Sequence, residues 1–195
     1  MSRVLAAAIV AILVGGPGSA ASGAKDPPAK LYYPTKVGTK RVYDRDTGGR
    51  YVEVVTDVKT KGGQTLVTVC EEVDGKLESS DVVSVSNQRL ASLYSGADPF
   101  DTPVPFLKPG AKAGATWDVE AAARGRTIKG RFTATGEEEV EVPAGKFKAL
   151  RVEANMTVNG RTFRATARYA PEVGMVKTVN PSNTQVLRSI TVGDK

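Results

Sequence analysis

The sequence predicts an all-β fold, an antiparallel meander that forms a curved sheet or half-barrel, with a two-sheet β-sandwich as the alternative. Val- and Thr-rich segments are punctuated by Gly, Asn and Pro, several segments alternate strictly between apolar and charged residues, and no stretch has helical periodicity. Because successive side chains of a strand point to opposite faces, this alternation gives each strand one buried and one wet face, as in an antiparallel sheet. The inward residues are small and aromatic residues are few, which suits either a curved sheet or a thin sandwich.

The N-terminal residues have the organisation of a secretory signal peptide. A single basic residue, Arg3, precedes the apolar run Val4 to Val14, and a stretch of small residues follows. This run is shorter than the roughly 20 apolar residues that a membrane-spanning helix needs. We expect cleavage after Ala20 or after Ala24, because both positions satisfy the small-x-small pattern.

We expect three segments: a signal peptide at 1–20, a linker at 21–30 and a single β domain at 31–195. Export by the general secretory route would place this domain in the periplasm or outside the cell, with no transmembrane segment in the mature chain. No cysteine follows the apolar run closely, so we do not expect a lipid anchor. The only cysteine, Cys70, cannot form an intramolecular disulfide, and its flanks predict an inert, half-buried thiol on a strand.

The first part of the domain is predicted to be a meander of short strands joined by turns that are rich in glycine. The strands predicted here are Thr39–Asp44, Arg50–Lys59, Gln64–Val73 and Leu77–Ser86. In the second part, clean alternation predicts strands at Thr127–Thr135, Leu150–Val158 and Phe163–Tyr169. Asn159-Gly160, between the last two, predicts a type I′ hairpin, because both central residues of that turn need positive φ.

The stretch V-E-V-P-A-G-K-F, which ends at Phe147, predicts a tight turn between two strands. Pro143 fixes φ, and Gly145 can take the positive φ that reverses the chain. Phe147 and Ala149 lie on odd positions, whereas the apolar set from Leu150 onward is even, which predicts a β-bulge near Ala149 and Leu150.

A faint internal repeat links the two parts of the domain. Gly38, Gly49, Arg50 and Val52 recur at one constant spacing as Gly114, Gly125, Arg126 and Ile128. Both copies have the pattern of a strand, a polar turn and a second strand. The matches are few, so duplication and coincidence both remain open.

Several short motifs resemble those of a group of uncharacterised secreted bacterial β-proteins. The motifs are V-P-A-G-K-F at 142–147, R-Y-A-P-E-V-G-M-V-K at 168–177, G-A-T-W at 114–117 and the opening Tyr32-Tyr33-Pro34. The resemblance implies a secreted β domain, and no catalytic residue lies among the motifs. More distantly, this group is similar to the half-barrel lipoprotein carriers of the bacterial envelope, whose curved sheet holds acyl chains. The present chain lacks the helical lid segments of those carriers.

The composition excludes several kinds of chemistry. The chain contains no histidine, which removes Ser-His-Asp and Cys-His nucleophile systems and most catalytic zinc sites. Glu137, Glu139 and Glu141 form one row, which could collect a hard cation but suits a solvated, charged edge strand better. We therefore predict no catalytic residue, no metal ligand and no cofactor, and we expect the protein not to be an enzyme.

The charge pattern argues against a nucleic-acid partner. The formal net charge is +6 and the pI is near 9.4, but Lys and Arg are scattered singly among Asp and Glu. Nucleic-acid binders usually concentrate positive charge on one face. We interpret the basic residues as solvated strand faces with a weak attraction to anionic envelope polymers or lipid headgroups.

The segment Asp98 to Gly110 carries the candidate binding residues. Its prolines exclude a central strand and predict either a long loop that pins apolar side chains over the core or a rim over a hydrophobic cavity. The ligand-binding residues predicted are Phe100, Phe106, Leu107 and Trp117.

Three functions follow from these observations, in order of preference. The first is a non-catalytic module that binds a hydrophobic or amphipathic molecule, such as a lipid, on the concave side of the sheet. The second is a structural or protein-interaction module with an envelope protein as its partner. The third is a hydrolase that uses two carboxylates, although the sequence nominates no such pair.

Overall fold

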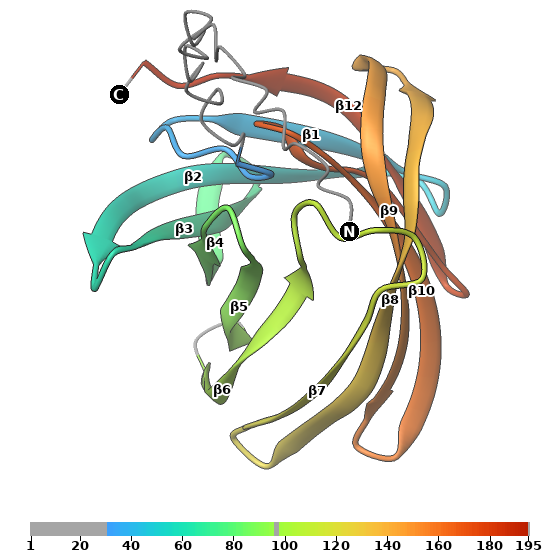
Figure 1. Ribbon diagram of the computed structural model, residues 1–195. Coiled ribbons are helices and arrows are strands. Elements are labelled where there is room, and N and C mark those ends of the chain that lie inside the picture. Colours follow the sequence, from blue (N-terminus) through green and yellow to red (C-terminus); the bar gives the residue numbers. More distant parts are fainter. Residues whose placement is uncertain (1–30, 96–97, 195) are drawn as a thin grey trace, which may run out of the picture.

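The structure is a computed structural model that describes residues 31–95 and 98–194. The predicted signal peptide and linker lie outside the described residues. The described residues form one antiparallel sheet of twelve strands that curves into a nearly closed barrel (Figure 1). The predicted curved antiparallel meander is therefore confirmed, and the sandwich alternative is wrong. Within these residues, no helix has the length and apolar composition needed to cross a membrane.

The strands follow one another as two meanders. They are β1 (Lys40–Arg45), β2 (Arg50–Lys61), β3 (Gln64–Val73), β4 (Lys76–Val85), β5 (Leu90–Ser95), β6 (Asp98–Leu107), β7 (Thr116–Ala123), β8 (Arg126–Val142), β9 (Gly145–Val158), β10 (Arg161–Ala170), β11 (Gly174–Asn180) and β12 (Asn183–Thr191). The order in the sheet is β6-β5-β4-β3-β2-β1-β12-β11-β10-β9-β8-β7. The meander of β1 to β6 is thus joined to the meander of β7 to β12 by a ladder between β1 and β12.

The predicted hairpin at Asn159-Gly160 is confirmed. These two residues connect β9 to β10 with φ values of 49° and 79°, the positive pair that a type I′ turn requires. Asp74-Gly75 and Arg124-Gly125 make the same two-residue connection between β3 and β4 and between β7 and β8. Short hairpins of this kind keep consecutive strands adjacent, so the sequence order becomes the order in the sheet.

The predicted position of the bulge is wrong. The register shift lies on β8 between Ala134 and Gly136, which makes Thr135 the extra residue, and β9 is regular at Ala149 and Leu150. Ala149 and Leu150 are both buried, but they belong to different core clusters. The apolar pattern changes there because β9 packs on both faces, and this change does not require an extra residue in β9.

The proline-rich segment is not the loop that the sequence predicted. Asp98 to Leu107 forms β6, the last strand at one end of the sheet, with a ladder to β5 on one side only. Proline is tolerated in such a strand because one of its edges needs no backbone donor. The exclusion of a central strand was therefore correct, and the prediction of a loop was wrong.

The core has two parts. The larger cluster gathers side chains from β2 to β9, and within it the rings of Trp117 and Phe132 stack with centroids 5.6 Å apart. The smaller cluster consists of Tyr43, Val140, Val142, Ala149, Ala170, Val176 and Leu187. It forms where the tip of the β8–β9 hairpin packs against β12, and there the backbone N of Ala144 donates to the carbonyl of Leu187 at 3.1 Å.

The repeated residues occupy equivalent places in the two meanders. Gly38 precedes β1 with a φ of 84°, and its backbone N donates to the carbonyl of Val55 at 2.8 Å. Gly114 precedes β7 with a φ of 86°, and its backbone N donates to the carbonyl of Ala134 at the same distance, 2.8 Å. Gly49 and Gly125 lie in the turns that lead into β2 and β8. The two meanders thus begin with the same backbone arrangement.

Candidate functional site

Two cavities, both open to solvent, lie on the inner side of the sheet. The first has a volume of about 190 Å³, and its lining residues are Tyr33, Arg41, Glu53, Phe106, Tyr169 and Met175. The second has a volume of about 160 Å³, and its lining residues are Tyr33, Tyr51, Glu53, Val69, Glu71, Ser79, Asp81, Val83, Ser92 and Phe106. Tyr33, Glu53 and Phe106 line both cavities, so these three side chains lie between the two spaces.

A buried ion pair forms the polar wall of the first cavity. Arg41 on β1 and Glu53 on β2 are directly paired in the ladder, and Arg41 Nη2 lies 2.7 Å from Glu53 Oε2. The guanidinium also donates to the Tyr33 hydroxyl at 3.1 Å and to the carbonyl of Val173 at 3.3 Å, while its carbon lies 4.7 Å from the centre of the Tyr33 ring. The Arg41 side chain is 3% exposed, so the ion pair belongs to the interior.

Burial and charge hold these groups in their protonated forms. Burial raises the pKa of Tyr33 to about 12 against the opposing effect of Arg41, and burial likewise raises the pKa of Tyr169. Burial alone would lower the pKa of Arg41, but the carboxylate of Glu53 and the nearby tyrosines outweigh it and raise that pKa. At neutral pH the tyrosines are neutral and the arginine is charged, so the wall offers hydrogen bonds and a fixed charge and contains no base among these groups.

One oxygen of the ion pair is poorly satisfied. Glu53 Oε2 is buried and has no hydrogen bond of good geometry, although Arg41 lies close to it. The guanidinium at 2.7 Å and a hydrogen bond from the Tyr51 side chain compensate the burial of this carboxylate. Oε2 itself is covered, but the Glu53 side chain as a whole is 16% exposed and lines both cavities, so a donor could reach its carboxylate group from either space.

The second cavity opens toward solvent between β2, β3 and β4. Val69 and Val83 are buried in its wall, whereas Ser79 and Asp81 at its rim are exposed. Glu71 also lines it, and Arg45 Nη2 approaches a Glu71 oxygen at 3.9 Å. The lining therefore changes from apolar near the core to acidic and hydroxylated near the rim, as an amphipathic ligand would require.

The structure brings one of the four predicted binding residues to the cavities. Phe106 on β6 lines both of them, and its ring lies 5.7 Å from the ring of Tyr169. Leu107 and Trp117 are buried in the larger core cluster, and Phe100 packs against that cluster partly buried. These three residues fill the core beside the cavities and line neither of them.

Sequence reasoning missed Tyr33, Arg41, Glu53 and Tyr169. The pattern of β2 gave no usable signal: Tyr51, Glu53 and Val55 share one face, and Val52 and Val54 share the other. Both faces contain apolar residues, so alternation could not show which face was buried.

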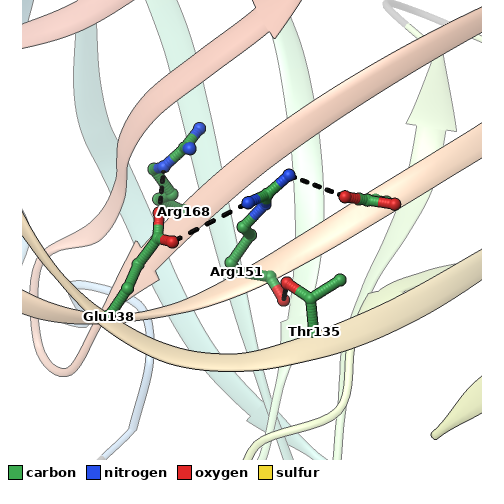
Figure 2. A network of polar contacts seen from close by, with 5 residues as sticks. Thr135, Glu138, Arg151 and Arg168 are labelled. Atoms are coloured by element: carbon green, nitrogen blue, oxygen red, sulfur yellow. Dashed lines mark hydrogen bonds and ion pairs between the residues drawn. The ribbon is translucent and has the colours of Figure 1, made fainter. Parts of the chain in front are cut away.

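The outer surface of β8, β9 and β10 has a polar network of its own (Figure 2). Glu138 contacts the guanidinium groups of Arg168 and Arg151, and Arg151 Nη2 lies 2.7 Å from Glu153 Oε1. The hydroxyl of Thr135, the bulged residue, donates to the Arg151 carbonyl at 3.4 Å. Each carboxylate in this network contacts a guanidinium, so the network stabilises the bent part of β8 and offers no free acid–base pair.

A shallow hollow of about 450 Å³ lies on the same three strands. Its lining residues are Arg131, Thr133, Glu153, Ala154, Asn155, Arg164, Ala165 and Thr166. Arg131 is held by Asp118 at 2.7 Å and 3.1 Å, and the lining residues are exposed or half-buried. The hollow is larger than either inner cavity, but it has no buried polar group and no aromatic ring to orient a ligand.

Acidic side chains make no metal centre in the described ranges. Within residues 31–95 and 98–194, His, Cys, Asp and Glu form no group that could hold a metal ion. Glu137 and Glu141 instead face Lys148 at 2.7 Å and Lys146 at 3.4 Å across the β8–β9 ladder. The β7–β8 ladder ends at Thr133, so beyond Gly136 the described ladders pair β8 with β9 on one side only. The other side of β8 is an edge there, which confirms the prediction of a charged edge.

Comparison with known proteins identifies the fold. No protein-family model matches the chain, and no curated protein sequence gives a significant match. A proposed exported protein with a YmcC-like fold from Bacteroides fragilis NCTC 9343 is similar in structure, with a TM-score of 0.59 and 15% identity over 83% of this chain and 99% of that one. A proposed lipoprotein from Parabacteroides distasonis ATCC 8503 has a TM-score of 0.59 and 15% identity over 85% of this chain and 100% of that one. This chain shares their fold. At such low identity the likeness concerns the fold and leaves the ligand open.

Proposed function

We propose that this protein is an exported, non-catalytic binding domain of the bacterial cell envelope that holds a small amphipathic molecule inside its curved sheet. The predicted signal peptide and the exported proteins of the same fold support a place in the periplasm or outside the cell. We infer from the absence of a cysteine near the apolar run that the mature domain carries no lipid anchor. The binding site is the pair of inner cavities.

The observation that carries this proposal is unfilled space beside a buried ion pair. Both cavities are open to solvent and adjoin each other, because Tyr33, Glu53 and Phe106 line both of them. A buried ion pair is also weak support for stability, because desolvation offsets much of its attraction. Space and charge together favour binding, for which an apolar pocket with a few convergent polar groups is the usual arrangement.

The dimensions limit the ligand. A cavity of about 150 Å³ lined by apolar side chains accommodates benzene, so each inner cavity has room for one ring or a short acyl segment. If Phe106 turns aside, the two spaces join and approach the lower limit of ordinary ligand sites, about 300 Å³. We propose an apolar body near Phe106 and Tyr169 and a polar end whose hydroxyl or amine donates to Glu53.

The test uses a neutral probe, N-phenyl-1-naphthylamine, whose fluorescence rises in an apolar site and whose three rings need the two spaces joined. The mature domain should bind it saturably, and native mass spectrometry of freshly purified protein should show bound small molecules. Phe106→Trp fills the space between the cavities and should weaken probe binding at least tenfold. Phe163→Trp is the matched control, because Phe163 is 39% exposed and lines neither cavity, and it should change the affinity less than twofold.

Two results would count against this function. Equal affinities for wild type and Phe106→Trp would place the probe outside the cavities. The absence of saturable binding, with no molecule carried through purification, would favour the structural module with an envelope protein as partner. A carboxylate-based hydrolase is the least favoured alternative, because Glu53 and Glu71 each face an arginine at 2.7 Å and 3.9 Å.

A further inference from the structure

The two meanders meet at a second joint, between β6 and β7. These strands are the two ends of the sheet, and within the described residues no ladder pairs them, although they lie side by side (Figure 1). Side chains connect them instead. Trp117 Nε1 donates to the carbonyl of Pro105 at 2.8 Å, and the backbone N of Ala122 donates to Asp101 Oδ1 at 2.8 Å. Asp98 adds exposed ion pairs to Arg124 at 3.1 Å and to Arg126 at 3.8 Å.

β6 is also held loosely on its other side. Its ladder to β5 has two register shifts, one between Leu90 and Ala91 and one between Ser92 and Tyr94. The prolines at 99, 103 and 105 remove backbone donors from the strand. A strand with an interrupted ladder on one edge and only side-chain contacts on the other separates from its neighbours more easily than a fully paired strand.

This loosely held strand carries the side chain that fills the middle of the binding site. Phe106 lines both inner cavities and belongs to β6, next to Pro105, whose carbonyl accepts the hydrogen bond of Trp117. Movement of β6 away from β7 would therefore break the Trp117 bond and withdraw Phe106 at the same time. The same displacement opens the sheet at its side and joins the two cavities.

We propose that the β6–β7 joint opens laterally and admits the apolar part of the ligand to the space around Phe106, which the solvent-facing mouths of the two cavities do not reach while Phe106 is in place. This inference rests on the proposed function, because it assigns a path to the same site. Closure restores the Trp117 bond and returns Phe106 against Tyr169, which encloses the apolar part of the ligand. An open edge between two strands suits a molecule with an extended apolar part, since the gap runs along the strands.

A disulfide across the joint tests this route. Asp101 and Ala122 are suitable positions, because a side-chain-to-backbone contact of 2.8 Å joins them and each lies on the outer face of its strand. A disulfide needs Cα atoms about 4.4–6.8 Å apart, which such a contact allows. The variant Asp101→Cys/Ala122→Cys is made with Cys70→Ser, so that the engineered thiols are the only ones present.

The control disulfide locks strands that are already paired. Glu120 and Lys129 are direct partners in the β7–β8 ladder, and their side chains form an exposed ion pair at 2.6 Å. Glu120→Cys/Lys129→Cys, also with Cys70→Ser, adds a bridge of the same kind without crossing the joint. Stopped-flow fluorescence of N-phenyl-1-naphthylamine then gives the association rate for each protein, oxidised and reduced.

The expected result is a slower association, by at least tenfold, for the oxidised Asp101→Cys/Ala122→Cys protein than for the same protein reduced. The control should bind at one rate in both states. Equal rates for the oxidised and reduced joint variant would overturn the lateral route while leaving the binding function intact. No saturable binding by the wild type would remove the proposed function and this inference with it.

A second variant covers the case in which the engineered disulfide does not form. Trp117→Phe keeps the aromatic ring against Phe132 but removes the donor to Pro105, and it should speed probe association several-fold. Phe132→Leu disturbs the same stacked pair but keeps the Trp117 donor to Pro105, and it should leave the rate within twofold. An unchanged rate in Trp117→Phe, with folding confirmed by circular dichroism, would contradict the proposal.

Discussion

The two meanders meet at two joints, and these joints are built differently. Between β1 and β12 a ladder of six residue pairs runs from Lys40–Thr191 to Arg45–Gln185. Between β6 and β7, within the described residues, side-chain contacts replace the ladder. If the six strands of the second meander are matched in order to the six strands of the first, β7 corresponds to β1, and β12 corresponds to β6. Each joint then connects the first strand of one meander to the last strand of the other, so the two joints are equivalent positions. The repeat of Gly38 as Gly114 supports this correspondence.

The difference between the joints can be read in the strands themselves. β6 contains prolines at 99, 103 and 105, whereas β12 contains none. Proline cannot donate to a ladder, so β6 cannot pair continuously on both edges. The comparison teaches that a symmetric sheet can be closed firmly at one joint and left separable at the other by the choice of a few residues.

The largest predicted effect on stability concerns the Arg41–Glu53 ion pair, which lies beside the β1–β12 joint. Arg41→Met leaves Glu53 buried without its cation, and we expect a loss of about 3–5 kcal/mol in the free energy of unfolding. Arg41→Met/Glu53→Leu removes both charges and should recover most of that loss. Urea denaturation followed by circular dichroism measures both values. A double variant as unstable as the single one would mean that packing around Arg41, and not the unpaired charge, causes the loss.

The next prediction tests how side-chain packing stabilises the β1–β12 joint. Leu187 on β12 is fully buried opposite Tyr43, and Leu187→Ala should lower the free energy of unfolding by about 3 kcal/mol. Ser189→Ala on the same strand is exposed and should change it by less than about 0.5 kcal/mol. Similar small losses for both variants would show that the smaller core cluster contributes little to this joint.

Much of the fold could be predicted from local patterns. Asn159-Gly160 fixes its hairpin through backbone conformation, and the alternation at Thr127–Thr135 fixes the state and the buried face of that strand. The bulge at Thr135 and the strand state of β6 could not be predicted, because they depend on which strand lies alongside. The constant spacing of the repeat also had a further match, Lys36 and Lys112, whose carbonyls accept bonds from Thr39 and Ala115 at 3.1 Å and 3.0 Å.

The binding site was predicted less well than the fold. Phe106 was found because an apolar ring on proline-rich backbone is unusual, and it does line both cavities. Trp117 was chosen because the chain's only tryptophan follows that segment closely, but it is 6% exposed and stacks on Phe132. Arg41 and Glu53 were missed because charged residues on strands usually face solvent. Only the closure of the sheet shows that these two face inward.

A matched pair of glycine substitutions tests the repeat. Gly38 and Gly114 have φ values of 84° and 86°, a region that costs an L-residue about 1–2 kcal/mol. Gly38→Ala and Gly114→Ala should therefore destabilise the protein by similar amounts in that range. A Cβ at Gly38 would meet Gly193 Cα at an ordinary 3.6 Å, and a Cβ at Gly114 would meet nothing within 4 Å, so clashes do not confound the comparison. Very different losses would mean that the two segments are not equivalent.

The smallest predicted effect on stability compares the carboxylates that bridge the two joints. Asp44 on β1 contacts Arg188 of β12 at 2.9 Å, and Asp98 on β6 contacts Arg124 beside β7 at 3.1 Å. Both pairs are largely exposed on the arginine side, so Asp44→Asn and Asp98→Asn should each change the free energy of unfolding by less than about 1 kcal/mol.

Local opening should nevertheless separate the two variants. Asp98→Asn should speed amide hydrogen exchange several-fold in β6 and β7, because side-chain contacts are what hold that joint together. Asp44→Asn should leave exchange in β1 and β12 unchanged, because the ladder still protects their amides. Exchange measured by mass spectrometry on peptides from the four strands decides the matter. Equal protection of β6 and β7 in the wild type and in Asp98→Asn would mean that the joint is held by packing alone.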